Sequence, residues 1–542
     1  MSVPTPDADG LYKRKLSGTS LFLAKGAMPE ELNYGDPIVS TLLWSTQKFE
    51  VARVVSDMQK LADGFVRMHS VPEGNRWKKV EGWTSAENVK EIQVSSEEEI
   101  WEFVEAKKTE SMSNPAHPWW EVFILNSSSS RSLALFRVHH AIGDGISLTA
   151  IFCQILCGED GMPIGLEAIG KLSGSSSSSS SSPRRKKETQ YGIGTALSAI
   201  AKIPKVAMVP KGPFDTETAY LGPAPERRKA ESSGKRKTVM LPSFSLEAVK
   251  KIAKSSEVPE GVTINDVLLS GFTGMLRRYC EFMGDDLFQY GSGDRSCCCG
   301  TTFNSRALVA FAMPRSPDEL RDPEDALRNA FTFISCPLAV LAKKPLQRLT
   351  LTAASVDALK RSGEAFTAFN IQSFAQKTLP EAEVKKTGVG LLSRHTCVFS
   401  NVPGPQFPVW AFGNAVDEPG FIYPNVCQQV ALVSYNGRIC GNVCLDPEVV
   451  ERSDVLGAFL LEEMQELAGE VGVPPESVLF SKDDPAAAML EKLVASRKET
   501  VKYETVARPV AAAAVVAEGE GEGEGLRSRL GKSGAEGAGV DA

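Results

Sequence analysis

The chain has 542 residues, which is too many for one ordinary hydrophobic core and indicates two or three domains. Apolar residues make up 42% of it and charged residues 23%, a balance typical of globular proteins. The net charge of −7 excludes a general electrostatic attraction to nucleic acid or to an anionic membrane.

The first part of the chain is expected to be a loose leader over residues 1–18 and a globular half over residues 19–172. Apolar residues recur at helical spacing between Lys48 and Phe65, and Leu133–Val138 has the pattern of a buried strand. No run of about 18 apolar residues lacks charge, so no transmembrane helix is predicted. The start of the chain has no secretory segment, which favours a reducing, cytosol-facing setting.

Residues 173–236 are predicted to form a linker. Eight consecutive serines, Ser175–Ser182, are followed by the basic segment Pro183–Lys187, and such a run has nothing to bury. The mildly apolar stretch Ile193–Val209 comes next. It is either a segment that lies in a membrane interface or an ordinary core or linker helix.

A second globular half is expected over residues 237–480. Thr263 is a plausible cap for a helix over Ile264–Tyr279, and Asn436-Gly437 between two apolar runs predicts a two-residue hairpin turn. Residues 481–506 are expected to form a peripheral helix, and the Ala-, Gly- and Glu-rich residues 507–542 a disordered tail. The pattern predicts an α/β fold of two halves joined by a flexible linker.

The strongest chemical signal is a pair of adjacent histidines, His139 and His140, in a chain with only five. They follow the predicted strand Leu133–Val138 and precede a turn that Gly143 and Gly145 permit. An imidazole at such a position suits general-base catalysis, because its pKa lies near neutrality. The alternative is that both histidines are structural and that Asp144 only caps the next helix.

The segment His139-His140-Ala141-Ile142-Gly143-Asp144-Gly145 resembles the HHxxxDG active-site motif of the CoA-dependent acyltransferase superfamily. Four further segments resemble motifs of the bifunctional wax ester synthase/diacylglycerol acyltransferases and occur in that family's order. They are Pro118–Glu121, Thr263–Leu269, Ser400–Pro405, and Ser434–Gly437 together with Asp446.

The resemblance implies two chloramphenicol-acetyltransferase-like domains with an active-site tunnel between them. It implies transfer of a fatty acyl group from acyl-CoA, a co-substrate rather than a bound cofactor, to diacylglycerol or to a long-chain alcohol. No metal and no nucleic-acid partner are expected. The implied location is peripheral, at a membrane or lipid droplet: the cytosolic face of the endoplasmic reticulum, the plasma membrane or the droplet itself. Two alternatives stay open, another alcohol as acceptor and a catalytically inactive lipid-droplet or membrane-binding protein.

The resemblance also assigns roles to individual residues. His140 would be the base, while His139, Asp144 and Gly145 would hold the geometry of the motif. Arg306, in Asn304-Ser305-Arg306, would pair with Asp144 from the second half. The implied substrate-binding residues are Trp120, Asn265, Asp266, Ser400, Asn401, Pro403 and Gly404.

Two of these assignments compete with simpler structural roles. Asn265 and Asp266 would form part of the active-site wall, with an oxyanion donor expected near Asn265, or they would only begin a helix. Ser400–Pro405 would line the acyl-CoA site at the domain interface, or would be a plain tight turn.

Overall fold

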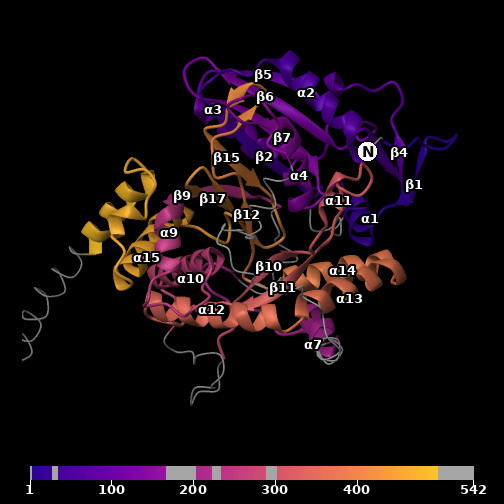
Figure 1. Ribbon diagram of the computed structural model, residues 1–542. Coiled ribbons are helices and arrows are strands. Elements are labelled where there is room, and N and C mark those ends of the chain that lie inside the picture. The colour runs from indigo at the N-terminus through magenta and orange to yellow at the C-terminus, as the bar shows by residue number, and fades with distance from the viewer. Residues whose placement is uncertain (1–2, 27–34, 166–202, 223–233, 288–301, 498–542) are drawn as a thin grey trace, which may run out of the picture. The chain divides into compact units, whose positions relative to one another are not determined.

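The computed structural model describes residues 3–26, 35–165, 203–222, 234–287 and 302–497. The chain divides into a compact unit over residues 1–488 and a second unit over residues 489–542. Every helix and strand named below belongs to the first unit (Figure 1). The polyserine run and the predicted disordered tail lie outside the described residues.

A five-stranded sheet forms the centre of the first half, with the strand order β15-β2-β7-β6-β5. Its strands and two covering helices are β2 (Ile38–Ser45), β5 (Val89–Val94), β6 (Trp120–Ser127), β7 (Ser132–His139), β15 (Glu418–Ile422), α2 (Val51–Gly64) and α3 (Glu97–Lys107). Phe136 and Val138 of β7 pack into the core on the α2 side, whereas Leu133 and Leu135 pack into the core on the α3 side. Both faces of β7 are buried, which explains its continuous apolar sequence.

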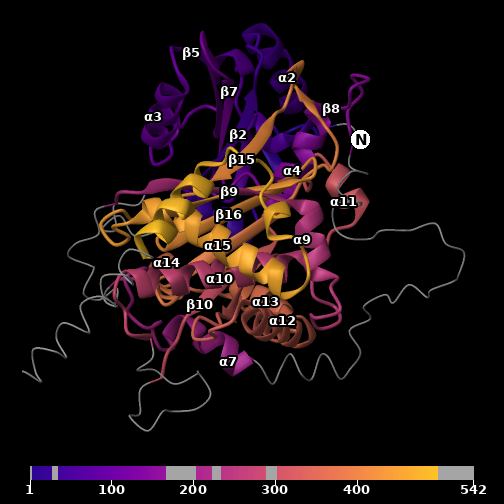
Figure 2. The same ribbon diagram turned by 90° about the vertical axis from the view of Figure 1, so that its left-hand side faces the viewer.

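The strand β15 comes from the second half of the chain yet completes the first sheet. It pairs with β2 from Glu418 opposite Trp44 to Ile422 opposite Ser40. Because β2 is antiparallel to both β15 and β7, the strands β15 and β7 are parallel and end at the same edge of the sheet. Figure 1 shows the orange β15 among the indigo and purple strands, and Figure 2 shows it beside β2.

A six-stranded mixed sheet forms the second half, with the order β11-β10-β12-β16-β17-β9. Its strands are β9 (Lys237–Ser245), β10 (Arg306–Ala312), β11 (Phe331–Pro337), β12 (Cys397–Pro403), β16 (Gln428–Tyr435) and β17 (Arg438–Leu445). The predicted hairpin is confirmed, since Tyr435 pairs with Arg438 and both Asn436 and Gly437 have positive φ.

The helix predicted after Thr263 is confirmed as α10 (Ile264–Phe282). Thr263 and Asp266 form a reciprocal capping box, which satisfies two backbone N–H groups at the start of the helix. The ring of Phe272 lies 6.1 Å from that of Phe399 on β12, so α10 packs directly on the sheet. Three further helices belong to this layer: α9 (Leu246–Ala253), α12 (Pro345–Arg361) and α15 (Leu456–Glu470).

The remaining elements surround the two sheets. They are the helices α1 (Gly18–Ala24), α4 (Gly145–Ile155), α7 (Ile203–Met208), α11 (Pro317–Arg321), α13 (Glu364–Thr378) and α14 (Glu381–Leu392), and the short strands β1 (Leu11–Lys15), β3 (Ser70–Glu73), β4 (Arg76–Lys79), β8 (Leu156–Cys157), β13 (Trp410–Ala411) and β14 (Asn414–Ala415). Single 3₁₀ turns occur at Val66–Met68, Ser85–Glu87, Val209–Lys211, Ser453–Val455 and Pro475–Ser477.

The prediction of a loose leader over residues 1–18 is wrong for the segment that forms β1. This strand pairs with β4, and Tyr12 within it is buried. The Tyr12 hydroxyl lies 2.6 Å from Nε2 of His69, so one aromatic side chain anchors the segment to the first half.

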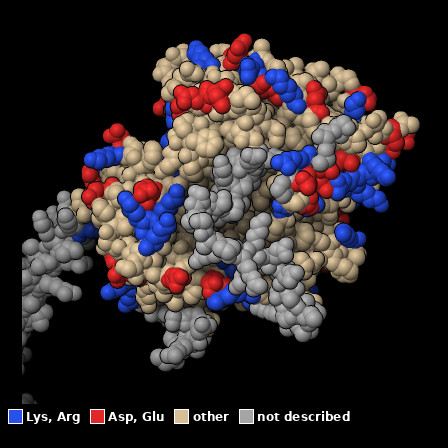
Figure 3. All heavy atoms as spheres, viewed as in Figure 1, with Lys and Arg blue, Asp and Glu red and all other residues tan. Residues whose placement is uncertain are grey.

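The described surface carries both signs of charge. Figure 3 shows acidic and basic side chains interspersed over the face that it displays. Within the described residues, no helix is both long enough and apolar enough to cross a bilayer.

Candidate active site

The predicted catalytic segment leaves the end of β7 and turns into α4. The backbone N–H of His140 donates to the carbonyl of Pro37 at 2.7 Å, which fixes the turn to the start of β2. A Cβ at Gly143 would lie 2.7 Å from Cβ of Ser147, so this position requires glycine. The Asp144 carboxylate accepts from the N–H of Ser147 at 3.0 Å and thereby caps α4.

His140 lies on the wall of a cavity of about 990 Å³, which is at the upper end of the usual range for small-molecule sites of about 300–1,000 Å³. The first half contributes α1, His140 and the start of α4 to its walls. The second half contributes β10, β11, β12, α13 and α14, and the segment with α7 closes one side. The cavity therefore lies between elements of both halves, as the predicted tunnel does.

A single asparagine, Asn329, sets the proton position on His140. Its side-chain N–H₂ donates to the carbonyl of His140 at 2.7 Å and to Oγ of Ser20 at 3.1 Å. Its Oδ1 must then face Nδ1 of His140, 3.0 Å away, and can only accept. Nδ1 therefore carries the proton, and Nε2 is left with a free lone pair and no partner among the described residues. This is the tautomer that a general base needs.

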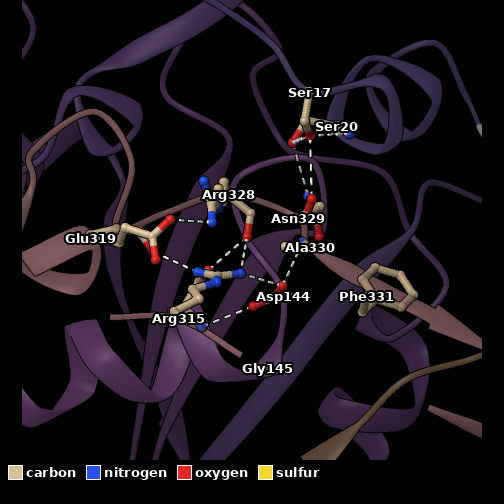
Figure 4. Close-up of polar contacts among 12 residues, drawn as sticks. Ser17, Ser20, Asp144, Gly145, Arg315, Glu319, Arg328, Asn329, Ala330 and Phe331 are labelled. Carbon is tan, nitrogen blue, oxygen red and sulfur yellow. Dashed lines mark hydrogen bonds and ion pairs between the residues drawn. The ribbon is translucent and has the colours of Figure 1, made fainter. Parts of the chain in front are cut away.

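Asp144 is held by an arginine from the second half, Arg315 (Figure 4). An N–H of Arg315 donates to Oδ2 of Asp144 at 2.5 Å, and the backbone N–H of Ala330 donates to the same oxygen at 2.8 Å. Both side chains of the ion pair are almost fully buried. Arg315 also donates to Oγ of Ser147 at 2.7 Å. Asp144 therefore joins the two halves, and it also lines the cavity beside His140.

The prediction that Arg306 is the partner of Asp144 is wrong. Arg306 begins β10, and its Nε donates to Asp215 at 2.7 Å. Asp215 also accepts from the N–H and hydroxyl of Thr396, both at 2.8 Å, so it ties the linker to the starts of β10 and β12. Arg315 follows the opposite end of β10, which is the end that reaches the His140 loop.

The second histidine of the pair, His139, points away from the cavity. Its Nδ1 accepts from the N–H of Ala141 at 3.1 Å, and its ring lies 4.6 Å from that of Trp119. Arg67 supports the same loop from the first half by donating to the carbonyl of Ile142 at 2.9 Å. His139 thus has the structural role that the resemblance assigned to it.

The structure brings only some of the other predicted residues to the cavity. Gly145 and the strand residues Ser400, Asn401 and Pro403 line it. Gly404 does not, although a Cβ there would lie 2.5 Å from the carbonyl of Ser434, so glycine allows the close approach of β12 to β16.

Three predicted substrate-binding residues do not line the cavity, and two of them have structural roles. Trp120 is buried in the core and donates to the carbonyl of Met68 at 2.8 Å. Asp266 is occupied by the cap of α10, and neither it nor Asn265 is among the cavity-lining residues that the structure describes. Asp266 therefore has the simpler of its two expected roles, which is to begin a helix. A hydrogen-bond donor for the developing oxyanion was expected near Asn265 and has to be sought elsewhere.

The residues that sequence reasoning missed are Asn329, Arg315 and Arg67. Each acts through a contact between segments that lie more than 70 residues apart. No local pattern marks such contacts, although a polar residue shortly before a strand, as Asn329 is before β11, was a detectable signal.

Burial changes the protonation of both histidines. It lowers the pKa of His139 to about 3 and also lowers the pKa of His140, against the opposing effects of Asp144 and Asn329. His140 is therefore neutral, and able to accept a proton, well below the usual range of a histidine. Activity that depends on it should persist on the acid side of pH 6.5.

The free energy of unfolding is expected to fall as the pH is lowered below about 6.5. Burial also lowers the pKa of His395 to about 3, so unfolded chains bind protons here while folded chains do not. Each such histidine contributes up to about 1.4 kcal/mol per pH unit to this slope. Urea denaturation at pH 7.5, 6.5 and 5.5 measures the slope. It should be shallower in His395→Asn, and an unchanged free energy over this range would contradict the buried neutral histidines.

No group of three or more His, Cys, Asp or Glu side chains with metal-binding geometry occurs among the described residues. His140, Asn329 and the buried Asp144–Arg315 pair therefore lie together beside a large, mainly apolar cavity.

Comparison with known families agrees with this site. Residues 93–268 match the wax ester synthase/diacylglycerol acyltransferase catalytic domain, and residues 327–468 match the WS/DGAT C-terminal domain. The two ranges together cover more than half of the chain. They include the His140 loop, Asn329 and the strand with Ser400.

Individual relatives have low sequence identity to this chain, but each alignment covers most of the relative's length. The O-acyltransferase WSD of Acinetobacter baylyi is 24% identical over 371 residues, covering 66% of this chain and 74% of the relative. Wax ester synthase/diacylglycerol acyltransferase 1 of Arabidopsis thaliana is 23% identical over 364 residues, covering 64% and 71%.

Solved structures support the fold. The wax ester synthase/diacylglycerol acyltransferase from Marinobacter aquaeolei VT8 superposes with a TM-score of 0.53 at 15% identity, covering 85% of this chain and all of that one. The first condensation domain of the calcium-dependent antibiotic synthetase gives 0.54 at 13% identity, with 88% and 100% covered. The two-domain α/β fold is thus that of the chloramphenicol-acetyltransferase-like enzymes. The chain belongs to the wax ester synthase/diacylglycerol acyltransferase family.

Proposed function

We propose that the protein transfers a fatty acyl group from acyl-CoA to the hydroxyl of diacylglycerol or of a long-chain alcohol, with His140 as the general base. The observation that carries this proposal is the His140–Asn329 contact, because it leaves Nε2 unprotonated at the wall of a large apolar cavity. The family relationship supplies the reaction class and the acyl-CoA donor.

The reaction needs no covalent intermediate on the protein. Nε2 of His140 takes the proton of the acceptor hydroxyl while the oxygen attacks the thioester carbonyl. The new C–O bond forms, the C–S bond breaks, and the proton passes from His140 to the departing thiolate of CoA. Asn329 keeps Nδ1 protonated throughout, so the imidazolium that forms in this step remains hydrogen-bonded.

The two alternatives predict different products. A catalytically inactive lipid-binding protein has no need of an oriented imidazole, whereas His140, Asn329 and the Asp144–Arg315 pair are all intact here. Expression in a host that lacks neutral lipid, with and without added long-chain alcohol, separates the cases. Triacylglycerol or wax ester supports the proposal. Neither product from the unmodified chain would refute it in favour of another alcohol or of an inactive protein.

Replacement of Asn329 tests how the base is positioned. Asn329→Ala should lower kcat about 10²-fold, because His140 loses the contact that fixes its ring. In Asn329→Asp, a carboxylate beside Nδ1 should stabilise the imidazolium and move the acid limb of the kcat/KM profile to higher pH. A pH profile of both variants measures this, and an unshifted acid limb in Asn329→Asp would contradict the assigned contact.

We further propose that the protein works at the surface of a membrane or lipid droplet on the cytosolic side, through the outer faces of α7 and α13. Five of the large apolar side chains that stand exposed on the described surface belong to these helices or directly follow them: Ile203, Met208, Phe366, Phe374 and Leu379. Phe374 is 68% exposed, and Leu379 both lines the cavity and is exposed, so the apolar surface is continuous with the mouth of the cavity.

The charges beside this surface are of both signs. The exposed residues on α13 are Phe366, Asn370, Phe374, Lys377 and Thr378, none of which is acidic, whereas the exposed Glu381 and Glu383 lie at the start of α14. Lipophilic acceptors dissolve in bilayers rather than in water, so an opening at this face would let them enter without crossing the solvent.

A pair of aspartate substitutions tests the lipid-binding surface. Phe374→Asp and Met208→Asp should each weaken binding to vesicles of phosphatidylcholine with anionic lipid about 10-fold, by loss of one buried apolar side chain. Met162→Asp is the matched control, since Met162 is 65% exposed and its segment pairs with Cys157 of β8 in the first half. Equal vesicle binding by all three variants would contradict this surface.

A further inference from the structure

The proposed reaction also needs a hydrogen-bond donor for the thioester carbonyl oxygen, and Tyr423, a tyrosine next to the base, is a candidate for it. Attack on a thioester places negative charge on the carbonyl oxygen, and a fixed O–H or N–H group directed at that oxygen lowers the barrier. The position expected from the sequence, near Asn265, does not line the cavity.

The strand arrangement explains why Tyr423 and His140 meet. His140 directly follows the end of β7, and Tyr423 directly follows the end of β15. The two strands are parallel and flank β2, so both side chains leave the same edge of the five-stranded sheet. Their ring centroids are 5.4 Å apart, and both residues line the cavity.

Two aromatic rings contact the His140 imidazole, those of Phe331 and Tyr423, and only the second carries a hydrogen-bond donor. The Tyr423 hydroxyl has no hydrogen-bond partner among the described residues, and the side chain is partly exposed on the cavity wall. The two side-chain amides farther along the same segment each use one N–H group within the protein. Asn425 donates to Gln429 at 3.1 Å, and Gln429 donates to the carbonyl of Val430 at 3.1 Å.

The protonation of Tyr423 fits the role of a donor. Burial raises the pKa of its hydroxyl well above the ordinary value for tyrosine, so it keeps its proton at neutral pH. An unpaired hydroxyl on the wall of a largely apolar cavity is available to a polar group of the bound substrate.

We propose that the hydroxyl of Tyr423 donates a hydrogen bond to the thioester carbonyl oxygen and stabilises the negative charge that develops there during attack. The inference rests on the proposed acyl transfer and deepens it by naming a second catalytic residue. His140 removes the proton from the acceptor, and Tyr423 holds the oxygen of the donor. The tyrosine neither gains nor loses a proton in the step.

The kinetic test compares the full-length protein with Tyr423→Phe and Tyr220→Phe. Phenylalanine keeps the ring against His140 and removes only the hydroxyl. Tyr220 is the matched control, because its hydroxyl is also buried without a hydrogen-bond partner but lies outside the residues described as lining the cavity. Tyr423→Phe should lower kcat about 10²–10³-fold with little change in either KM, whereas Tyr220→Phe should keep the kcat of the unmodified protein. An unchanged kcat in Tyr423→Phe, or a raised KM for the acceptor alone, overturns the proposal.

A binding measurement separates this inference from the proposed function. Two acyl-CoA analogues serve as probes. One has a trifluoromethyl ketone in place of the thioester, and this ketone adopts a tetrahedral, oxyanion-like form. The other is the corresponding inert thioether. Tyr423→Phe should bind the ketone about 10²-fold more weakly than the unmodified protein and the thioether equally well. Equal binding of the ketone by both proteins overturns the role of Tyr423 whether or not the chain turns over. Absence of product from the unmodified protein instead counts against the proposed function.

Discussion

Replacement of His140 by alanine is expected to lower kcat about 10²–10⁴-fold, because the acceptor hydroxyl loses the base that removes its proton. The effect should appear in kcat rather than in stability, since the N–H and carbonyl contacts of residue 140 are made by its backbone. Steady-state rates at saturating acyl-CoA, with product identified as ester, measure the change.

The control for this substitution is His117→Ala. His117 lies near Glu87 at 3.2 Å and is not among the cavity-lining residues of the described structure. It should keep the kcat of the unmodified protein. If His140→Ala retained more than about a tenth of the original kcat, a different group would have to be the base.

Replacement of Arg315 by alanine should lower the free energy of unfolding by about 3–5 kcal/mol, because Asp144 is then left as a buried charge without its ion-pair partner. The double variant Asp144→Asn with Arg315→Met removes both charges and should be less destabilised than Arg315→Ala alone. Urea denaturation of the three proteins measures both differences.

Arg321→Ala provides the comparison for a surface ion pair in the neighbouring helix. Arg321 is half exposed and lies 3.8 Å from Asp318, so its removal should change the free energy of unfolding by less than about 1 kcal/mol. If Arg315→Ala were no less stable than Arg321→Ala, the Asp144–Arg315 pair would not hold the two halves together.

Local features were predictable from the sequence because neighbouring residues determine them. The strand before His139, the cap at Thr263 and the turn at Asn436-Gly437 each depend on contacts within a few residues, and the structure confirms all three. His140, which the resemblance to the family motif assigned as the base, is the histidine of the pair that lines the cavity.

Contacts between distant segments were not predictable in the same way. Sequence similarity to an Asn-x-Arg element favoured Arg306 as the partner of Asp144. Arg306, however, begins β10 and binds Asp215 there. Arg315 follows the far end of β10, which is the end that reaches the His140 loop and Asp144. Tyr423 reaches His140 only because β15 inserts beside β2, which no periodicity in either segment indicates. Strand β1 was missed because its burial depends on pairing with β4, about 65 residues away.

The most direct measurement quantifies both products of the reaction, free CoA and ester, in the same assay. The purified full-length protein is supplied with acyl-CoA and with either diacylglycerol or a long-chain alcohol presented in vesicles, and free CoA thiol and ester are quantified over time. A base-catalysed transfer from acyl-CoA to the acceptor requires one thiol for each ester formed, with ester formation in His140→Ala slowed about 10²–10⁴-fold. Thiol release without ester, or ester formation at an undiminished rate in His140→Ala, would contradict it.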